Sequence, residues 1–84
     1  MPRYYLHLDE CGIGSRDDEG RDAVDVAAAR AAAIKEARVI MAAEVQEGRL
    51  CLACCIIITD HAGAEIDRVR FRDALTVNGL REGG

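Results

Sequence analysis

The first segment of the chain alternates between apolar and polar positions. In residues 3–8, every second position carries a large apolar side chain: Tyr4, Leu6 and Leu8. The positions between them carry Arg3, Tyr5 and His7. Because successive side chains of a β-strand point to opposite faces, this period of two predicts a half-buried strand.

The next segment is expected to form a turn and a short second strand. Glu10-Cys11-Gly12 is suited to a turn, and residues 13–16 are expected to form a short second strand that Gly14 weakens. The acidic run Asp17-Asp18-Glu19 with Gly20 follows. It lacks the ligand spacing of a calcium loop and is read as a solvated turn.

A long helix is expected from Val26 to Gly48. The segment before Gly48 is rich in alanine and contains neither glycine nor proline, and Asp25 is a good N-cap. Gly48 suits the left-handed conformation that ends many helices. At 100° per residue one stripe is expected to face the core: Val26, Ala33, Ile34, Ala37, Ile40, Met41 and Val45.

Two further strands are expected after the helix. The apolar run 50–59 predicts a third strand, and 65–71 predicts a fourth after the turn Asp60-His61-Ala62-Gly63. Ile66 is out of step with Val69, so a bulge is expected between them. The segment 76–84 loses the pattern and is expected to be a flexible tail.

These elements predict one α+β domain over residues 1–75. The order is β-β-α-β-β, with one long helix packed on one face of a four-stranded antiparallel sheet. If the helix reverses the chain, pairing the third strand with the first gives the strand order 2-1-3-4.

Composition limits the classes of function. The chain has 84 residues, a formal net charge of -4 and only 4% aromatic residues, so its core must be thin. The acidic balance argues against a general nucleic-acid binder. No segment approaches the roughly 20 apolar residues of a membrane span, and the N-terminus lacks a signal-peptide pattern. We therefore expect a cytoplasmic protein with reduced thiols.

Several short motifs together resemble a known family. They are Met1-Pro2-Arg3-Tyr4-Tyr5 with His7, Asp17-Asp18-Glu19-Gly20, Asp25 before an Ala-Ala-Arg helix, Thr59-Asp60 with Gly63, and Phe71-Arg72-Asp73-Ala74. In this combination the chain resembles a family of short, uncharacterised alphaproteobacterial proteins classed as a domain of unknown function. The resemblance implies a small α+β domain and supplies no activity, cofactor or catalytic residue.

Four cysteines raise the question of metal or redox chemistry. Cys51 and Cys54 have the Cys-x-x-Cys spacing of a zinc knuckle, which requires a tight turn. On a strand, side chains three apart point to opposite faces, and Cys51 and Cys55 would lie roughly 13 Å apart. We therefore interpret these cysteines as small buried hydrophobes and expect neither a metal nor a cofactor. Metal binding by Cys51, Cys54 and a loop residue such as His61 or Cys11 would require the strand to be broken. For redox chemistry, the sequence gives no sign of an activated thiol.

The sheet face opposite the helix is the candidate interaction surface. It is predicted to combine an apolar centre with a basic and aromatic rim: Arg3, Tyr5, His7, Cys55, Ile57, Arg68 and Arg70, with Cys51 on the same face. His7 and Cys55 could meet there, but an open sheet face makes a poor reaction pocket. An apolar centre with arginine and tyrosine around it suits a protein partner.

The sequence thus favours a non-enzymatic module for protein interaction. Its partner is expected to be a second copy or another protein, most simply a homodimer through the sheet face or an edge strand, with Ile57 near the centre of the interface. The first alternative is a regulatory module that binds nucleic acid or a toxin, since the order of elements resembles that of HicB-type antitoxins. A small thiol-dependent enzyme is the third reading. No small-molecule ligand is indicated, because the chain contains no phosphate-binding loop, dinucleotide motif or serine-nucleophile elbow.

Overall fold

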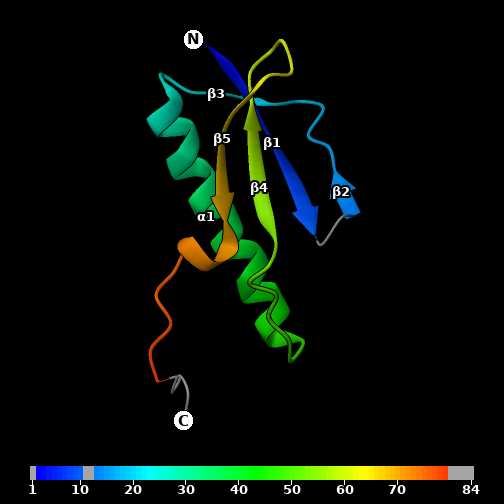
Figure 1. Ribbon diagram of the computed structural model, residues 1–84, viewed down its shortest axis with the longest axis vertical. Coiled ribbons are helices and arrows are strands. Elements are labelled where there is room, and N and C mark those ends of the chain that lie inside the picture. Colours follow the sequence, from blue (N-terminus) through cyan, green and yellow to red (C-terminus); the bar gives the residue numbers. More distant parts are fainter. Residues whose placement is uncertain (1, 11–12, 80–84) are drawn as a thin grey trace.

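The computed structural model describes residues 2–10 and 13–79 and contains one long helix and one antiparallel sheet (Figure 1). The strands are β1 (Arg3–Glu10), β2 (Ile13–Ser15), β3 (Arg21–Asp22), β4 (Cys55–Thr59) and β5 (Glu65–Arg70). The helix α1 spans Val26–Gln46, and a short 3-10 helix η1 spans Phe71–Asp73. The predicted α+β class is therefore confirmed. The predicted turn at Cys11 and most of the predicted tail, residues 80–84, lie outside the described residues.

In the described part of the chain the sheet has five strands, so the expectation of four was wrong by one. Its main path is β2-β1-β4-β5, and every pairing is antiparallel. These four strands have the neighbours that the predicted order gave them, and the added strand β3 pairs with the start of β1. It was missed because Arg21 and Asp22 are both exposed and form only a two-residue strand without an apolar pattern.

The helix begins and ends where the sequence indicated. The carboxylate of Asp25 accepts a hydrogen bond from the N–H of Ala28 at 2.9 Å, and Gly48 has a φ of 85°. The buried stripe differs from the prediction, because Val26 and Val45 are 39% and 58% exposed. The helical residues that are buried are Ala29, Ala33, Ala37, Met41 and Glu44.

Helix length explains the exposed valines. With 21 residues α1 is about 31 Å long, whereas β4 has five residues and spans about 17 Å. The ends of the helix therefore extend beyond the strands that could cover them. The alanines in the middle let the helix lie close to the sheet.

The third predicted strand is shorter than expected. β4 begins only at Cys55, and the chain bends at Leu52 and Ala53. The fourth predicted strand ends at Arg70, because Phe71 starts η1. The predicted bulge in β5 is present, since Ile58 pairs with Asp67 and Thr59 with Glu65, which leaves Ile66 as the extra residue.

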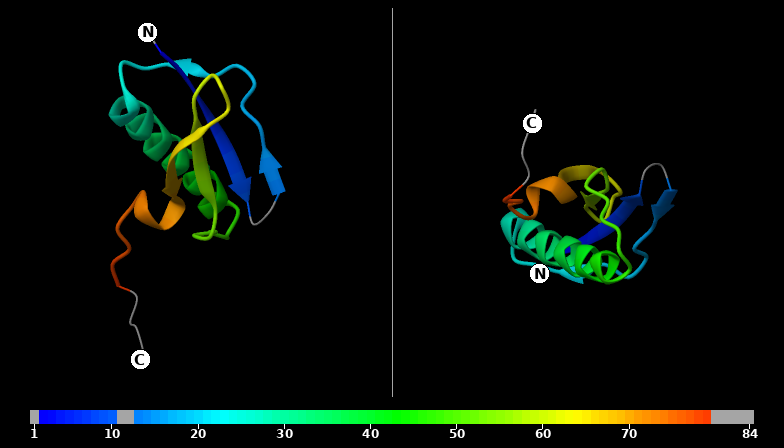
Figure 2. Two further views of the ribbon diagram at one scale, coloured as in Figure 1. Left: turned by 45° about the horizontal axis from the view of Figure 1, so that its top comes forward. Right: turned by 90° about the horizontal axis from the view of Figure 1, so that it is seen from below.

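The core lies between α1 and one face of the sheet. Its largest fully buried side chains are Phe71, Met41, Ile56, Ile58, Val69 and Cys54. Both views in Figure 2 show α1 along one side of the sheet. α1 is the only α-helix in the part of the chain that the structure describes, so it leaves the opposite face without a helical cover. Within the same residues, no helix has the length and apolar character needed to cross a membrane.

Candidate interaction surface

The sheet face away from α1, here called the open face, is built from three rows of paired residues across β1, β4 and β5. His7, Ile57 and Arg68 form the middle row. The two flanking rows are Tyr5, Thr59 and Glu65 on one side, and Asp9, Cys55 and Arg70 on the other. Because directly opposed residues of paired strands share a face, Ile57 lies at the centre of this surface.

Two rings of β1 are aligned on the open face. The rings of Tyr5 and His7 are nearly parallel, with an interplanar angle of 5° and centroids 6.3 Å apart. The Nδ1 atom of His7 accepts a hydrogen bond from the N–H of Asp17 at 3.0 Å. The neutral ring therefore carries its proton on Nε2, which donates to Oγ1 of Thr59 at 3.0 Å. Bonds at both nitrogens fix the orientation of the ring.

Asp17 supplies a hydrogen-bond acceptor at the outer edge of β1. β3 pairs with Arg3 and Tyr4, and β2 pairs with residues 8–10, which leaves the middle of this edge without a strand partner. The Oδ2 atom of Asp17 accepts the N–H of Leu6 at 3.1 Å. A carboxylate therefore takes the place of a strand carbonyl at this position.

The same carboxylate organises its own loop. Its Oδ1 atom accepts the N–H groups of Glu19 at 3.2 Å and Gly20 at 3.0 Å. Burial alone would raise the pKa of Asp17, but the backbone donors lower it overall, below the ordinary value of 3.8. The reading of residues 17–20 as a solvated turn was therefore wrong for Asp17, although Asp18 and Glu19 are exposed.

Gly20 is required where this loop passes β1. Its φ is 72°, and a Cβ placed on it would lie 2.9 Å from Cε2 of Tyr5 and 3.0 Å from the carbonyl oxygen of Tyr4. Both the backbone conformation and the close approach exclude a side chain there. The loop therefore packs directly against the Tyr5 end of the open face.

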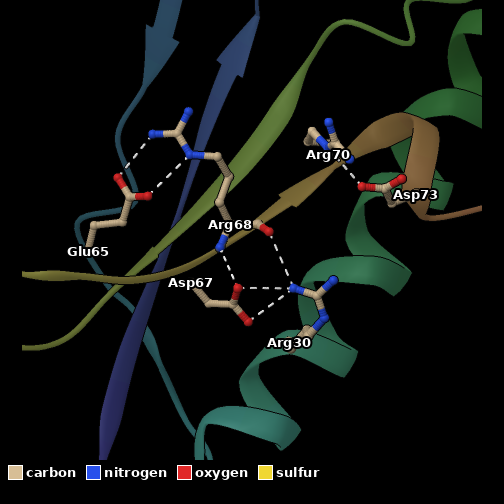
Figure 3. A network of polar contacts seen from close by, with 6 residues as sticks. All are labelled: Arg30, Glu65, Asp67, Arg68, Arg70 and Asp73. Carbon is tan, nitrogen blue, oxygen red and sulfur yellow. Dashed lines mark hydrogen bonds and ion pairs between the residues drawn. The ribbon is translucent and has the colours of Figure 1, made fainter.

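The arginines of the open face are paired with acidic groups. Arg68 forms an ion pair with Glu65 at 3.0 Å, and Arg70 pairs with Asp73 at 2.8 Å (Figure 3). The hydrogen bond from Arg68 holds the pKa of Glu65 below its ordinary value. Arg3, at the far end of β1, lies 3.4 Å from Asp22. The rim is therefore balanced in charge rather than basic.

Two shallow hollows flank the ring of His7. One, of about 340 Å³, lies between the loop 16–18 and the turn 60–63 and includes Tyr5, Thr59 and His61 in its lining. The other, of about 380 Å³, lies between β2 and Ile57. Ile57 and His7 therefore stand between two concave regions of the open face.

The structure distributes the predicted surface residues unevenly. Arg3, Arg68 and Arg70 are exposed, and Tyr5, His7 and Ile57 are half-buried. Cys55 is only 7% exposed, and Nη1 of Arg68 lies 3.9 Å from its sulfur. The apolar part of the open face is therefore smaller than expected, with Ile57 as its centre.

Cys51 packs against the core rather than on the open face, and the prediction that Cys51 and Cys54 point to opposite faces was wrong. Because the chain bends at Leu52 and Ala53, the sulfurs of Cys51 and Cys54 are 3.0 Å apart. The argument from strand geometry failed because it assumed that the strand extended through these residues. Among residues 2–10 and 13–79, no three His, Cys, Asp or Glu side chains are arranged to hold a metal ion. Cys11, the alternative to His61 as a ligand beside Cys51 and Cys54, lies outside the described residues.

Sequence reasoning also missed Thr59 as a partner of His7. Continuing the period of two from Ile57 would have placed Thr59 on the open face. The sequence indicates the role of Asp17 only weakly. An aspartate three residues before a glycine is typical of turns closed by a side chain. No local pattern indicates its bond to Leu6.

Comparison with known proteins identifies a family and adds no activity. Neither the curated proteins nor the solved structures contain a significant match to the chain. Residues 3–72 match the family described as a domain of unknown function, DUF6894. This range includes all five strands, α1 and the residues of the open face. The chain therefore belongs to the DUF6894 family.

Proposed function

We propose that the chain is a non-enzymatic interaction module that forms a homodimer through its open face. The observation that carries the proposal is the position of Ile57. It lies in the middle strand and middle row of a face that α1 does not cover. A second copy placed over this face would remove the exposed part of Ile57 from water. Complete burial of an exposed isoleucine contributes roughly 1.5 to 3 kcal/mol, and the half-buried Ile57 contributes a part of that.

Charge supports a second copy of the chain as the occupant. Arg68 and Arg70 each have an acidic neighbour on the same chain. A face that is close to neutral can meet itself across a two-fold axis without opposing like charges. A nucleic acid would instead require these arginines to exchange their carboxylates for phosphates, and the net charge of -4 opposes that approach.

The edge of the sheet at β5 is a weaker site for a second copy. The N–H of Arg68 donates to Oδ1 of Asp67 at 2.8 Å, and its carbonyl oxygen accepts from Nη1 of Arg30 at 3.3 Å (Figure 3). Strand addition at an edge needs such backbone groups to pair with the incoming chain. The open face is therefore the preferred interface.

Sedimentation equilibrium of the whole chain between roughly 5 and 200 µM tests the proposal, because this range brackets a dissociation constant of tens of micromolar, as expected for a modest interface. We expect the average mass to rise from one chain to two across this range. Ile57→Asp places a charge at the centre of the face and should keep the chain monomeric, with an unchanged circular dichroism spectrum.

The matched control is Val39→Asp, because Val39 is 59% exposed on α1, the element that packs on the opposite face of the sheet. This variant should dimerise like the wild type. A wild type that stays monomeric at all concentrations would overturn the proposal, as would a Val39→Asp variant that loses the dimer to the same extent as Ile57→Asp.

A further inference from the structure

The turn between α1 and β4 brings two cysteines into contact. The thiol of Cys54 donates to the sulfur of Cys51 across 3.0 Å. Cys51 is half-buried, whereas Cys54 is 1% exposed and belongs to the core. Cys51 is therefore the more accessible residue of the pair, and Cys54 is closed off from solvent.

Backbone contacts hold this turn at both ends. The N–H of Cys51 donates to Oε1 of Glu44, a buried residue in the last turns of α1, at 3.3 Å. The carbonyl oxygen of Cys54 accepts the N–H of Phe71 at 2.9 Å. The approach of the sulfurs is thus fixed by contacts with α1 and η1 and does not depend on side-chain rotation alone.

The distance between the sulfurs favours a dithiol over a metal site. Two thiolates on one tetrahedral zinc ion at about 2.3 Å lie about 3.8 Å from each other. The observed sulfurs are closer than that, and a disulfide bond of about 2.05 Å needs a further approach of only about 1 Å.

We infer that Cys51 and Cys54 form a reversible dithiol–disulfide site that is oxidised by low-molecular-weight disulfides. The thiolate of Cys51 attacks one sulfur of the external disulfide, RSSR, whose S–S bond breaks. A mixed disulfide forms between Cys51 and one R–S group, and the other leaves as a thiolate and takes up a proton.

The buried thiol completes the exchange. Cys54 loses its proton and attacks the sulfur of Cys51, which breaks the bond between Cys51 and the R–S group. The second R–S group leaves as a thiol after it gains this proton. The two cysteines lose two electrons and two protons in total, and RSSR becomes two RSH molecules. An excess of the small thiol reverses both steps.

The test uses the whole reduced chain in mixtures of oxidised and reduced glutathione, followed by alkylation and peptide mass spectrometry. No lysine or arginine lies between Arg49 and Arg68, so trypsin leaves Cys51, Cys54 and Cys55 on one peptide. Fragmentation must therefore locate the alkylated residue. We expect a disulfide between Cys51 and Cys54 with Cys55 alkylated, and full recovery of the thiols in excess reduced glutathione.

Matched variants separate the two sulfurs. Cys55→Ser removes the neighbouring buried thiol and should leave the oxidation unchanged. The reaction of Cys54→Ser should stop at a glutathione adduct on Cys51. If circular dichroism shows that this variant is unfolded, Cys54→Ala replaces it in the test. Cys51→Ser should form neither the disulfide nor the adduct at this turn.

Three results would overturn the inference. The first is a wild type that keeps Cys51 and Cys54 reduced in excess oxidised glutathione. The second is a disulfide that uses Cys55 or Cys11 in place of either member of the pair. The third is about one equivalent of zinc in the purified chain that protects both thiols, which would assign the pair to a metal site.

Discussion

At the scale of single residues, Asp17 joins the loop 16–20 to the edge of β1. Its carboxylate accepts N–H groups from Leu6, Glu19 and Gly20, and its own N–H fixes the ring of His7. An uncharged side chain of the same shape cannot replace it, because the amide nitrogen of asparagine donates hydrogen bonds and cannot accept one.

We therefore expect Asp17→Asn to lower the free energy of unfolding by about 1 to 3 kcal/mol at pH 7, since a backbone donor loses its acceptor. The pKa of Asp17 is lowered in the folded chain. Its stabilising effect is therefore complete above the unfolded value, near 3.8, and is lost as the pH falls through the folded value. Urea unfolding between pH 7 and pH 3 should show the free energies of unfolding of the wild type and of Asp17→Asn approaching each other at low pH.

The control for this prediction is Asp18→Asn, because Asp18 is the exposed neighbour of Asp17. Other carboxylates, including Asp60 and Asp67, also have lowered pKa values, so the wild type alone cannot isolate one residue. A constant difference between wild type and Asp17→Asn over the whole pH range would contradict the assigned role.

The residues of regular strands were predictable, and the contacts of the loop were not. Alternation alone placed Tyr4 and Leu6 in the core and Tyr5 and His7 on the open face. This works because successive side chains of a strand point to opposite faces of the sheet. Asp17 bonds to a backbone group 11 residues away. That contact depends on the path of residues 16–20, which no period in the sequence encodes.

At the scale of elements, the edge strand β5 is protected by a helix. Arg30 of α1 donates from Nη1 to both carboxylate oxygens of Asp67, at 3.1 and 3.0 Å, and to the carbonyl oxygen of Arg68 (Figure 3). Asp67 in turn accepts the N–H of Arg68. Two backbone groups that an edge strand would otherwise present to another chain are thereby occupied.

Arg30→Ala should expose this edge. We expect a loss of about 1 kcal/mol in the free energy of unfolding, because the ion pair is partly exposed. The larger effect should be concentration-dependent association through β5. The measurement is sedimentation velocity, repeated on samples stored for several days. The chain used also carries Ile57→Asp, so that the open face does not contribute to association.

Arg38→Ala is the matched control, because Arg38 also lies on α1 and donates to a carbonyl, that of Ala74, outside β5. It should cost stability without promoting association. Equal association of the Arg30 and Arg38 variants would mean that general destabilisation, and not the exposed edge, is responsible.

The types of element were predictable from local pattern, and some of their limits were set by other parts of the fold. Asp25 and Gly48 marked the ends of the helix correctly, because caps act locally. The start of β4 was misplaced because Cys51 and Cys54 are held by Glu44 and Phe71. Those contacts bend an apolar segment that would otherwise suit a strand.

At the scale of the whole molecule, the sheet has two unlike faces and one thin core. The alanines of α1 contribute little apolar area, so the stability of the domain depends on a few large side chains. A chain of 84 residues has a free energy of unfolding of about 4 to 13 kcal/mol. Ile58 has no exposed surface and lies beneath the helix, whereas its neighbour Ile57 is half-buried on the open face.

Substitution of these two adjacent isoleucines should therefore give different results. Ile58→Ala leaves a cavity between sheet and helix and should lower the free energy of unfolding by about 2 to 5 kcal/mol. Ile57→Ala removes the same atoms from a site that water already reaches, so it should cost the monomer less than half as much. Urea unfolding followed by circular dichroism at roughly 2 µM, where a dimer with a dissociation constant of tens of micromolar is mostly dissociated, compares the two. Equal losses would show that both faces of β4 are buried within one chain, and the open face would then have no apolar surface to offer a second copy.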